Sequence, residues 1–558
     1  MAYDLLIKDA QIIDGTGSPA FAGDVAVKDG KIAEVGKITG GATRVINAHN
    51  QVVSPGFVDT HTHMDAQLLW DPLATSSCWH GITTIMMGNC SFSVAPCRPE
   101  DRSAVLHTLE RVEGMSLEAL TAGVDWSWET FPQYLGRIGG KLGLNTASLM
   151  GYSAVRQFAL GNAASDRAAT PTEIATMQQI VREGLAAGAY GVSFNFNKGH
   201  AAGDGRPVPS RLAPFDEVLA IADALRGSKT AVIQMNDNPC PEREPLDVCE
   251  DISQRAGRPV WWIPLLQFYG QPGVWKTRLD HSARQVAAGS MVRAMSTSRT
   301  IDVVFNMRNA HIFDTMGAWR NMLIKKPEDV MRDMRDPGVR AALQEDMDDP
   351  SLKLAFSRRW DMVEVAEVKN PKFKPLEHRM IADLAKEQGK KPLDVFLDLC
   401  IDDTMDTLFL TILANGDEAA AAEILRAPHT LIGLSDAGAH AALECGYGFT
   451  TYLLGHWVRD KKIMPIEEAV RKLSSMHTDQ MGLTDRGRIK PGQKADINVF
   501  DPKTIEMLHP VAVNDFPAGA RRYIQKANGI SYTLVNGQVL MENGEHTGAY
   551  PGQLLKGN

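Results

Sequence analysis

The stretch that decides the fold is Phe57-Val58-Asp59-Thr60-His61-Thr62-His63-Met64-Asp65, which continues an apolar run that begins at Val52. If this run is a β-strand, successive side chains alternate between its two faces, so His61 and His63 lie on the same face. Both imidazoles then leave the C-terminal end of the strand together, at a spacing that suits one metal ion. The alternative for an isolated H-x-H pair is two histidines that face solvent.

Seven further apolar runs follow, and most of them precede a stretch with helical periodicity. The eight predicted strands span residues 56–63, 82–88, 146–150, 190–194, 230–234, 259–263, 291–295 and 430–434. Near-continuous apolar runs are typical of parallel strands that are buried on both faces. Eight alternating strand and helix units predict an α/β fold that closes into a (β/α)8 TIM barrel.

Both ends of the chain differ from the barrel region in their sequence pattern, which predicts short strands joined by tight turns. Neither residues 1–54 nor residues 486–558 hold enough strands for a stable sandwich alone, so we expect the two ends to build one discontinuous β-sandwich. The barrel is expected to take residues 55–485. Two long and largely helical insertions, near 98–143 and 300–428, interrupt it. Insertions of this length usually act as lids or oligomer contacts.

Composition limits the classes of function. The 558 residues are 44% hydrophobic and 22% charged, as in ordinary globular proteins. A net charge of −9 argues against nucleic acid as the main partner. We expect no membrane span and no signal peptide. Seven scattered cysteines without a C-x-x-C pair favour a reducing cytoplasm, and a homo-oligomer stays open.

Polar residues follow several predicted strands at the end where a barrel carries its active site. Asp436 comes directly after the eighth strand, where a carboxylate can take a proton from a metal-bound water or merely cap a helix. With His61 and His63 present, a metal ligand and general base is the favoured role. His440 lies four residues further on, close to Asp436 if a helix starts there. It is expected to serve the substrate or to have a structural role beside the carboxylate.

The string Pro-Gly-Phe-x-Asp-x-His-x-His-x-Asp at residues 55–65 resembles the first-strand signature of the amidohydrolase superfamily, and the likeness extends over nearly the whole chain. Gly-Asn-Cys after the second strand is similar to the D-aminoacylase branch of that superfamily. The resemblance implies a metal-dependent hydrolase with a TIM barrel and a small β-sandwich. It also implies that His61, His63 and Asp436 hold a metal and that Cys90 ligates a second metal position. A buried, inert thiol is the alternative for Cys90.

Two positions depart from that branch. Its members carry a histidine after the fifth strand and another after the sixth, whereas this chain has Gln234 and Leu265 at about those places. Leucine cannot ligate a metal, and a neutral glutamine is a poor zinc ligand. We therefore expect one divalent metal per chain, zinc, with Cys90 as an extra ligand or a neighbour.

Five residues on strand-end loops are candidates for substrate binding. Arg156 or Arg211 can hold a substrate carboxylate with two parallel hydrogen bonds, and Tyr152 can polarise a carbonyl. His200 can ligate, move protons or bind substrate, and His440 completes the set. Surface salt bridges, packing and plain exposure are the alternatives for these residues.

These observations predict a metal-dependent amidohydrolase that cleaves an amide bond in an N-acyl amino acid or a related small N-acyl compound. Such an enzyme acts on carbon–nitrogen bonds other than peptide bonds. An esterase, lactonase or cyclic-amide hydrolase on the same barrel is the first alternative, since it needs the same activated water. A barrel that binds a ligand without turnover is the second.

Overall fold

The computed structural model describes the chain except residues 1, 309, 314, 353–355, 443–444 and 558. It divides into two compact units. The barrel unit comprises Met1–Leu265, Arg278–Arg299 and Ala422–Asn558, and the inserted unit comprises Leu266–Thr277 and Thr300–Ala421. No helix in the described part of the chain combines the length and the apolar character that crossing a membrane requires.

Parallel strands form the centre of the barrel unit, and each overlaps one of the eight predicted runs. In chain order they are β6 (Phe57–Asp59) with β7 (His61–Thr62), β8 (Ile82–Met87), β9 (Asn145–Ser148) with β10 (Met150–Gly151), β11 (Gly191–Asn195), β12 (Val232–Asn236), β13 (Val260–Ile263), β14 (Arg293–Ser296), and β18 (Leu431–Ile432) with β19 (Leu434–Ala437). Neighbours in this order pair in parallel, and β19 pairs with β7. The first and last strands are therefore neighbours, and the predicted barrel fold is confirmed.

Single residues interrupt three of these strands, but hydrogen bonds continue across the gaps. Thr60 N donates to Gly433 O at 3.1 Å, Gly433 N donates to Ser296 O at 3.2 Å, and Leu149 N donates to Met87 O at 2.8 Å. A Cβ at Gly433 would lie 2.5 Å from the His477 ring and 2.7 Å from Thr60 Oγ1. Glycine thus permits the close approach between the first and last strands.

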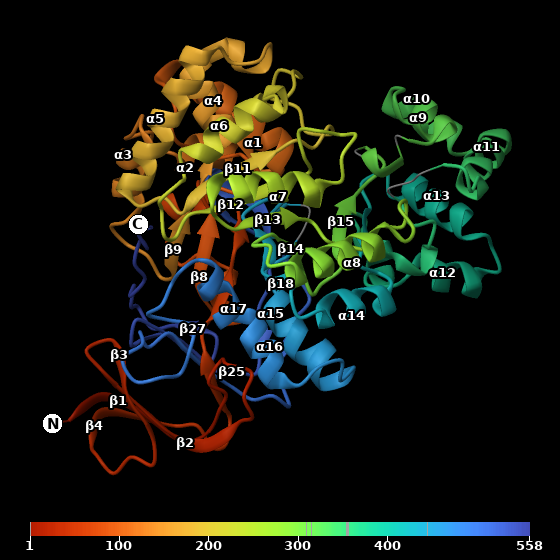
Figure 1. The fold of residues 1–558 in the computed structure, drawn as a ribbon. Coiled ribbons are helices and arrows are strands. Elements are labelled where there is room, and N and C mark those ends of the chain that lie inside the picture. Colours follow the sequence, from red (N-terminus) through yellow and green to blue (C-terminus); the bar gives the residue numbers. More distant parts are fainter. Residues whose placement is uncertain (1, 309, 314, 353–355, 443–444, 558) are drawn as a thin grey trace. The chain divides into compact units, whose positions relative to one another are not determined.

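Helices follow the strands, and α4 to α7 pack against one another in chain order (Figure 1). They are α4 (Tyr152–Leu160), α5 (Pro171–Ala187), α6 (Phe215–Asp223), α7 (Pro245–Ala256), α8 (Val274–Ala287), α14 (Glu418–Arg426), α15 (Phe449–Tyr452), α16 (Ile466–Leu473) and α17 (Ser475–Gln480). The start of α5 shows why such helices form, since Thr170 and Glu173 make a reciprocal capping box before it. The predicted insertion at 98–143 is helical, with α1 (Arg102–Glu113), α2 (Leu117–Gly123) and α3 (Phe131–Ile138).

The two ends of the chain share one sheet, in which red and blue strands lie side by side in Figure 1. The N-terminal strands are β1 (Tyr3–Ile12), β2 (Phe21–Lys28), β3 (Lys31–Gly36), β4 (Ala42–Asn47) and β5 (Val52–Pro55), and the C-terminal ones are β20 (Ile497–Phe500), β25 (Ile530–Val535), β26 (Gln538–Glu542) and β27 (Glu545–His546). Antiparallel pairing of β5 with β20 joins the two sets. One apolar cluster contains residues from both ends, including Ile7, Val53, Val499 and Leu534. The exact domain bounds at 54 and 486 stay a prediction.

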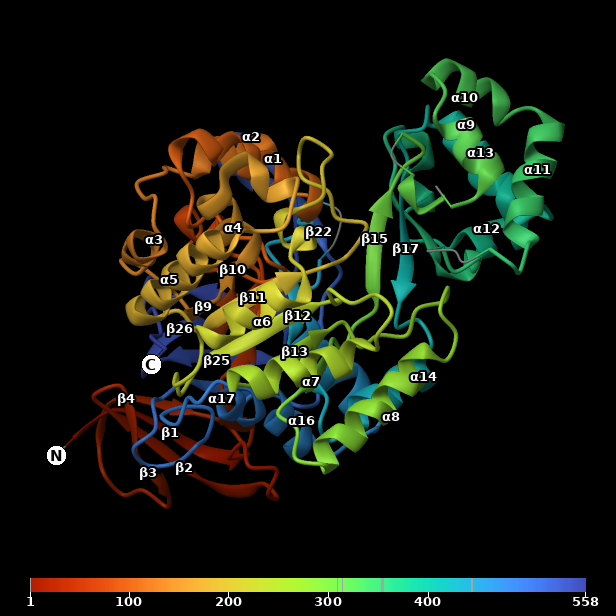
Figure 2. The same cartoon turned by 45° about the horizontal axis from the view of Figure 1, so that its top comes forward.

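The inserted unit holds a feature that the sequence did not indicate. It contains a three-stranded antiparallel sheet in the order β15 (Ile301–Phe305), β17 (Leu408–Ala414), β16 (Val363–Glu367) (Figure 2). The helices are α9 (Gly317–Leu323), α10 (Pro327–Asp333), α11 (Pro337–Asp348), α12 (Ile381–Gln388) and α13 (Pro392–Asp402). The expectation of a largely helical insertion was therefore incomplete, because short strands between helices are poorly distinguished by periodicity. Its role as a lid stays a prediction.

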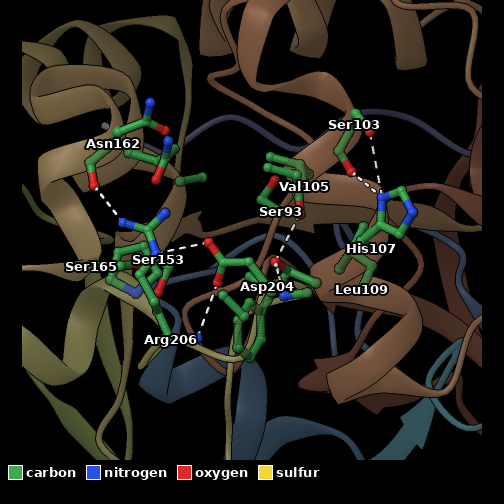
Figure 3. A pocket seen from close by; sticks show the side chains of 18 of the residues that line it. Ser93, Ser103, Val105, His107, Leu109, Ser153, Asn162, Ser165, Asp204 and Arg206 are labelled. Atoms are coloured by element: carbon green, nitrogen blue, oxygen red, sulfur yellow. Dashed lines mark hydrogen bonds and ion pairs between the residues drawn. The ribbon is translucent and has the colours of Figure 1, made fainter.

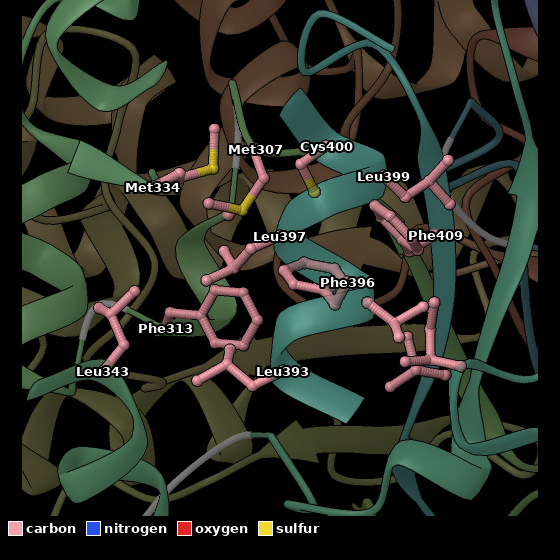
Figure 4. Packing of buried hydrophobic residues seen from close by; sticks show 14 of the residues in the cluster. Met307, Phe313, Met334, Leu343, Leu393, Phe396, Leu397, Leu399, Cys400 and Phe409 are labelled. Carbon is pink, nitrogen blue, oxygen red and sulfur yellow. The ribbon is translucent and has the colours of Figure 1, made fainter. Parts of the chain in front are cut away.

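An aromatic core holds the inserted unit together. Phe396 on α13 is fully buried, and Figure 4 shows its ring among Phe313, Leu397 and Phe409. The Phe396 ring centroid lies 4.5 Å from that of Phe409, a separation at which aromatic pairs attract beyond simple burial. The inserted unit thus has a hydrophobic core of its own, as an independently stable domain requires.

We predict that Phe396→Ala lowers the free energy of unfolding of the inserted unit by about 3–5 kcal/mol, because it removes a buried ring and leaves a cavity. Hydrogen exchange of peptides from residues 300–421 measures this unit separately. Ile324→Ala is the matched control, since Ile324 is 77% exposed in the same unit. Equal exchange rates in the two variants would contradict the assignment of Phe396 to the core.

Candidate metal centre

Two imidazoles and one carboxylate meet at the carboxyl end of the first and last strands. His61 lies in β7 and His63 follows it, and both side chains are buried. His61 Nε2 lies 3.2 Å and His63 Nε2 lies 3.0 Å from the same atom, Asp436 Oδ1. The alternation predicted for the H-x-H pair therefore brings both rings to one point.

The backbone of β19 places Asp436. The register of β19 against β7 shifts between Leu434 and Ala437, and Asp436 has a φ of +59°. Such irregularities re-aim side chains next to functional sites. The Asp436 side chain is 29% exposed, whereas those of His61 and His63 are 1% and 3% exposed. Asp436 is thus the member of the trio that an incoming molecule meets first.

Cys90 completes a group of possible metal ligands. Its Sγ lies 3.5 Å from His61 Nε2, and the ligand atoms of His61, His63 and Cys90 all lie within 4.8 Å of one another. The thiol is on the loop after β8, as its place in the sequence predicts, and it is buried.

Four hydrogen bonds fix the loop that carries Cys90, three of them to side chains from other parts of the chain. Cys90 N donates to Gln234 Oε1 at 3.1 Å, which holds a residue whose φ is +50°. The flanking bonds run from Gly88 N to Asp65 Oδ2 at 3.0 Å, from Ser91 N to Ser193 Oγ at 2.9 Å, and from Asn89 Nδ2 to Thr62 O at 3.1 Å. A loop held at each residue presents the sulfur in one position, as an ion-binding site needs.

The charges of the group compensate one another. Burial alone would lower the pKa of His61, but the negative charges of Cys90 and Asp436 raise it to about 9. The two imidazoles in turn hold the pKa of Asp436 well below its usual value and lower that of Cys90, in both cases against the effect of burial. The two anionic groups, Asp436 and Cys90, favour protonation of the neighbouring imidazoles. A divalent cation bound there would supply the same positive charge.

The hydrogen-bonding inventory agrees with a metal ion. His61 Nδ1 is buried without a hydrogen-bond partner among the described residues, whereas His61 Nε2 and His63 Nε2 both face Asp436 Oδ1, and His61 Nε2 also faces Cys90 Sγ. Buried nitrogens that converge with anionic groups on one point form an arrangement that a cation would stabilise. Two imidazoles, a thiolate and a carboxylate are the donor types that zinc prefers. The residues present therefore fit a metal.

Glu113 is a residue of this site that the sequence did not point to. It ends α1, is 3% exposed, and its Oε2 lies 3.6 Å from His63 Nδ1. Against the effect of burial, the charge of Glu113 is the main cause that raises the pKa of His63. A carboxylate beside the outer nitrogen of a ligating histidine orients the ring and raises its basicity. Nothing in the sequence around position 113 signals that contact.

Gln234 and Leu265 are the two positions at which the sequence is expected to depart from the D-aminoacylase branch. Gln234 lies in β12 and Leu265 follows β13, and both are buried. The Gln234 carbonyl oxygen accepts a hydrogen bond from Cys90 N, while Gln234 Nε2 has no hydrogen-bond partner among the described residues. One of these side chains thus serves the Cys90 loop, and the other is apolar.

The predicted role of Arg156 and Tyr152 in substrate binding is wrong. Both lie on α4 and are fully buried. Arg156 Nε donates to Glu217 Oε1 at 2.8 Å, and Tyr152 Oη donates to the same oxygen at 2.6 Å. The other Arg156 nitrogens bond to the carbonyls of Ala164 and Arg167. All three nitrogens of the guanidinium thus have partners inside the protein, and the ion pair with Glu217 links α4 to α6.

His200 and His440 lie nearer to the metal centre. Asn195 Nδ2 donates to His200 Nδ1 at 2.7 Å, and burial first, then the charge of His440, lower the pKa of His200. His440 N donates to Glu113 O at 2.5 Å, so its backbone is tied to the helix that faces His63. Their roles toward a substrate stay predictions.

We predict that Arg156→Met lowers the free energy of unfolding of the barrel unit by about 3–5 kcal/mol, because Glu217 would be left as an unpaired buried charge. Urea denaturation followed by circular dichroism measures the change. Arg167→Met is the control, since the Arg167 side chain is exposed in its pair with Glu173 and surface pairs contribute about 0–1 kcal/mol. A stable Arg156→Met variant with a raised KM alone would restore the substrate role.

Comparison with known proteins places the chain. The family described as "Amidohydrolase family" matches residues 44–541. An N-acyl-D-aspartate deacylase of Alcaligenes xylosoxydans xylosoxydans is 27% identical over 99% of this chain and 95% of its own length, and a D-aminoacylase of the same organism is 25% identical over 99% and 97%. A solved N-acyl-D-glutamate deacylase of Bordetella bronchiseptica, complexed with zinc and a phosphonate inhibitor, shares the fold with a TM-score of 0.67, 22% identity and full coverage of both chains. The resemblance read from the first strand is confirmed, and the chain belongs to the amidohydrolase family.

Proposed function

We propose that the protein is a metal-dependent amidohydrolase that cleaves the amide bond of N-acyl amino acids, releasing a carboxylic acid and a free amino acid. The observation that carries this proposal is the convergence of His61 Nε2 and His63 Nε2 on one oxygen of Asp436. The similarity to D-aminoacylase and to N-acyl-D-aspartate deacylase supports N-acyl-D-amino acids as the substrate class.

The metal would be held by His61, His63 and Asp436, with Cys90 as a fourth ligand. When bound, a zinc ion acidifies a water molecule and polarises the scissile carbonyl. We propose one ion per chain, because Gln234 bonds to the Cys90 loop and Leu265 offers no ligand atom.

Asp436 would move the proton. The two imidazoles keep its carboxyl ionised at neutral pH, and its partial exposure leaves it within reach of substrate. The carboxylate would accept a proton from the attacking water and deliver it to the leaving amine nitrogen. Asp436 would carry out both proton transfers from one position, because it lies in β19, whose backbone pairs with β7.

The free carboxylate of the substrate needs a cation, and Arg211 is our candidate. It lies in the short 3-10 helix Pro209–Leu212 that follows β11, is partly exposed, and Arg211 Nη1 donates to His200 O at 2.8 Å. That bond keeps the guanidinium beside His200. Arg156 cannot serve, since it is buried against Glu217.

We predict that Asp436→Asn lowers kcat for an N-acetyl-D-amino acid about 10²- to 10⁴-fold, the usual contribution of general acid–base catalysis. The measurement is steady-state release of free amine over a panel of N-acetyl D- and L-amino acids. Asp460→Asn is the control, since Asp460 is an exposed aspartate paired with Arg459. Full activity of Asp436→Asn would contradict its role. Turnover of esters, lactones or cyclic amides without any N-acyl amino acid would favour the alternative hydrolase.

We predict that Glu113→Gln weakens zinc binding about 10- to 100-fold, as loss of a carboxylate beside a ligating histidine does elsewhere. Competition titration with a zinc chelator measures the affinity without reference to turnover. Glu110→Gln on the exposed face of the same helix should leave the affinity unchanged. The same affinity in both variants would exclude Glu113 from the site.

A further inference from the structure

A cavity of about 440 Å³ lies beside the loop that carries Cys90, and none of the residues proposed for metal binding or proton transfer lines it (Figure 3). Its walls come from α1, α4, the short 3-10 helix Gly161–Ser165 and the loop around residues 202–206. Phe92 and Ser93 line it on the side of the Cys90 loop. Cavities of this volume are in the range that binds small molecules in proteins.

The lining is chiefly apolar, and its charges do not suit an anion. Apolar side chains come from Phe92, Val105, Leu109, Ala154 and Pro209. Arg206 is the one arginine or lysine among the described lining residues, and it is already bonded. Its Nε donates to Asp204 Oδ2 at 2.7 Å, and its Nη1 donates to Asn162 O at 2.9 Å and to Asp166 Oδ1 at 3.0 Å, as Figure 3 shows in part. Since Glu100 and Asp204 also line the cavity, a carboxylate would meet negative charge there.

Three features tie the cavity to the metal centre. Phe92 follows Cys90 by two residues, and its ring centroid lies 6.1 Å from that of His200. Ser153 lines the cavity, and its Oγ lies 2.9 Å from Ser91 Oγ, next to Cys90. Leu109 lines the cavity on α1, about 6 Å along the helix from Glu113, which faces His63. The cavity and the candidate metal centre are thus built on the same loop and the same helix.

We propose that this cavity receives an uncharged, apolar arm of the substrate whose amide bond is cleaved at the metal centre. This proposal rests on the proposed function and names the substrate class more closely. Either the acyl chain or the amino acid side chain has the chemistry that the lining selects. An arm of several methylenes that passes Phe92 would bury its surface against Val105, Leu109 and Ala154, and each buried methylene would raise kcat/KM about fourfold.

The test compares N-acetyl-D-alanine with three longer substrates. N-octanoyl-D-alanine lengthens the acyl arm, N-acetyl-D-2-aminodecanoate lengthens the side chain, and N-suberoyl-D-alanine has an acyl arm that ends in a carboxylate. We expect kcat/KM to rise at least tenfold for one of the two apolar arms, which identifies the arm, and not for the charged one. No gain for either apolar arm, with N-acetyl-D-alanine still turned over, overturns the cavity proposal alone. No turnover of any of the four overturns both proposals.

A variant with a filled cavity tests whether the preference for a long apolar arm arises in this cavity. Val105→Trp places a large ring in the cavity from a half-buried position on α1, and Glu110→Trp adds the same ring on the exposed side of that helix. We expect Val105→Trp to lose the preference for the long arm and to keep kcat/KM for N-acetyl-D-alanine within about twofold. Glu110→Trp should keep both. Retention of the long-arm preference in Val105→Trp overturns the assignment, provided that its circular dichroism matches that of the wild type.

Discussion

The pairing of β7 with β19 is the constraint on which the rest of the site depends. It closes the ring of strands, and it sets His61 opposite Leu434, two residues before Asp436. Fold closure and assembly of the candidate metal centre are therefore one event. The close approach at Thr60 and Gly433 explains why glycine stands between β18 and β19, since a Cβ would clash with His477 and Thr60. A barrel that did not close would separate the H-x-H pair from its carboxylate.

Polar contacts around the centre turn this closure into a defined geometry. The loop with Cys90 is anchored by Ser193 in β11, Gln234 in β12 and Asp65 in the segment after β7, so three parts of the barrel position the sulfur. Glu113 reaches His63 from the first insertion, which makes α1 part of the site and not only a cover. Gln234, at the position where the resemblance implies a metal-ligating histidine, has a structural task instead. Its amide oxygen accepts a hydrogen bond from the backbone of Cys90, which supports our proposal of a single metal ion.

Much of the fold and part of the site could be predicted from the sequence. The apolar runs located all eight barrel strands, and strand alternation placed His61 and His63 on one face. Residues near strand ends, such as Cys90 after β8 and Asp436 in β19, were also found, because a barrel brings strand ends together. The substrate-binding role of Arg156 was predicted because the sequence does not show its partner. An arginine that binds substrate and one that pairs with a buried Glu217 cannot be distinguished from the sequence alone. Glu113 had no local signal at all, because its contact with His63 depends on how an insertion folds back. The three-stranded sheet of the inserted unit was missed for a similar reason, as its strands are short and pair across long loops.

We propose that the H-x-H pair and Asp436 hold one metal ion per chain. Elemental analysis of protein purified without chelators measures this most directly, with the double variant His61→Asn, His63→Asn prepared alongside. We expect close to one equivalent of zinc in the wild type and almost none in the double variant. Two equivalents in the wild type, or one equivalent retained by the double variant, would contradict it.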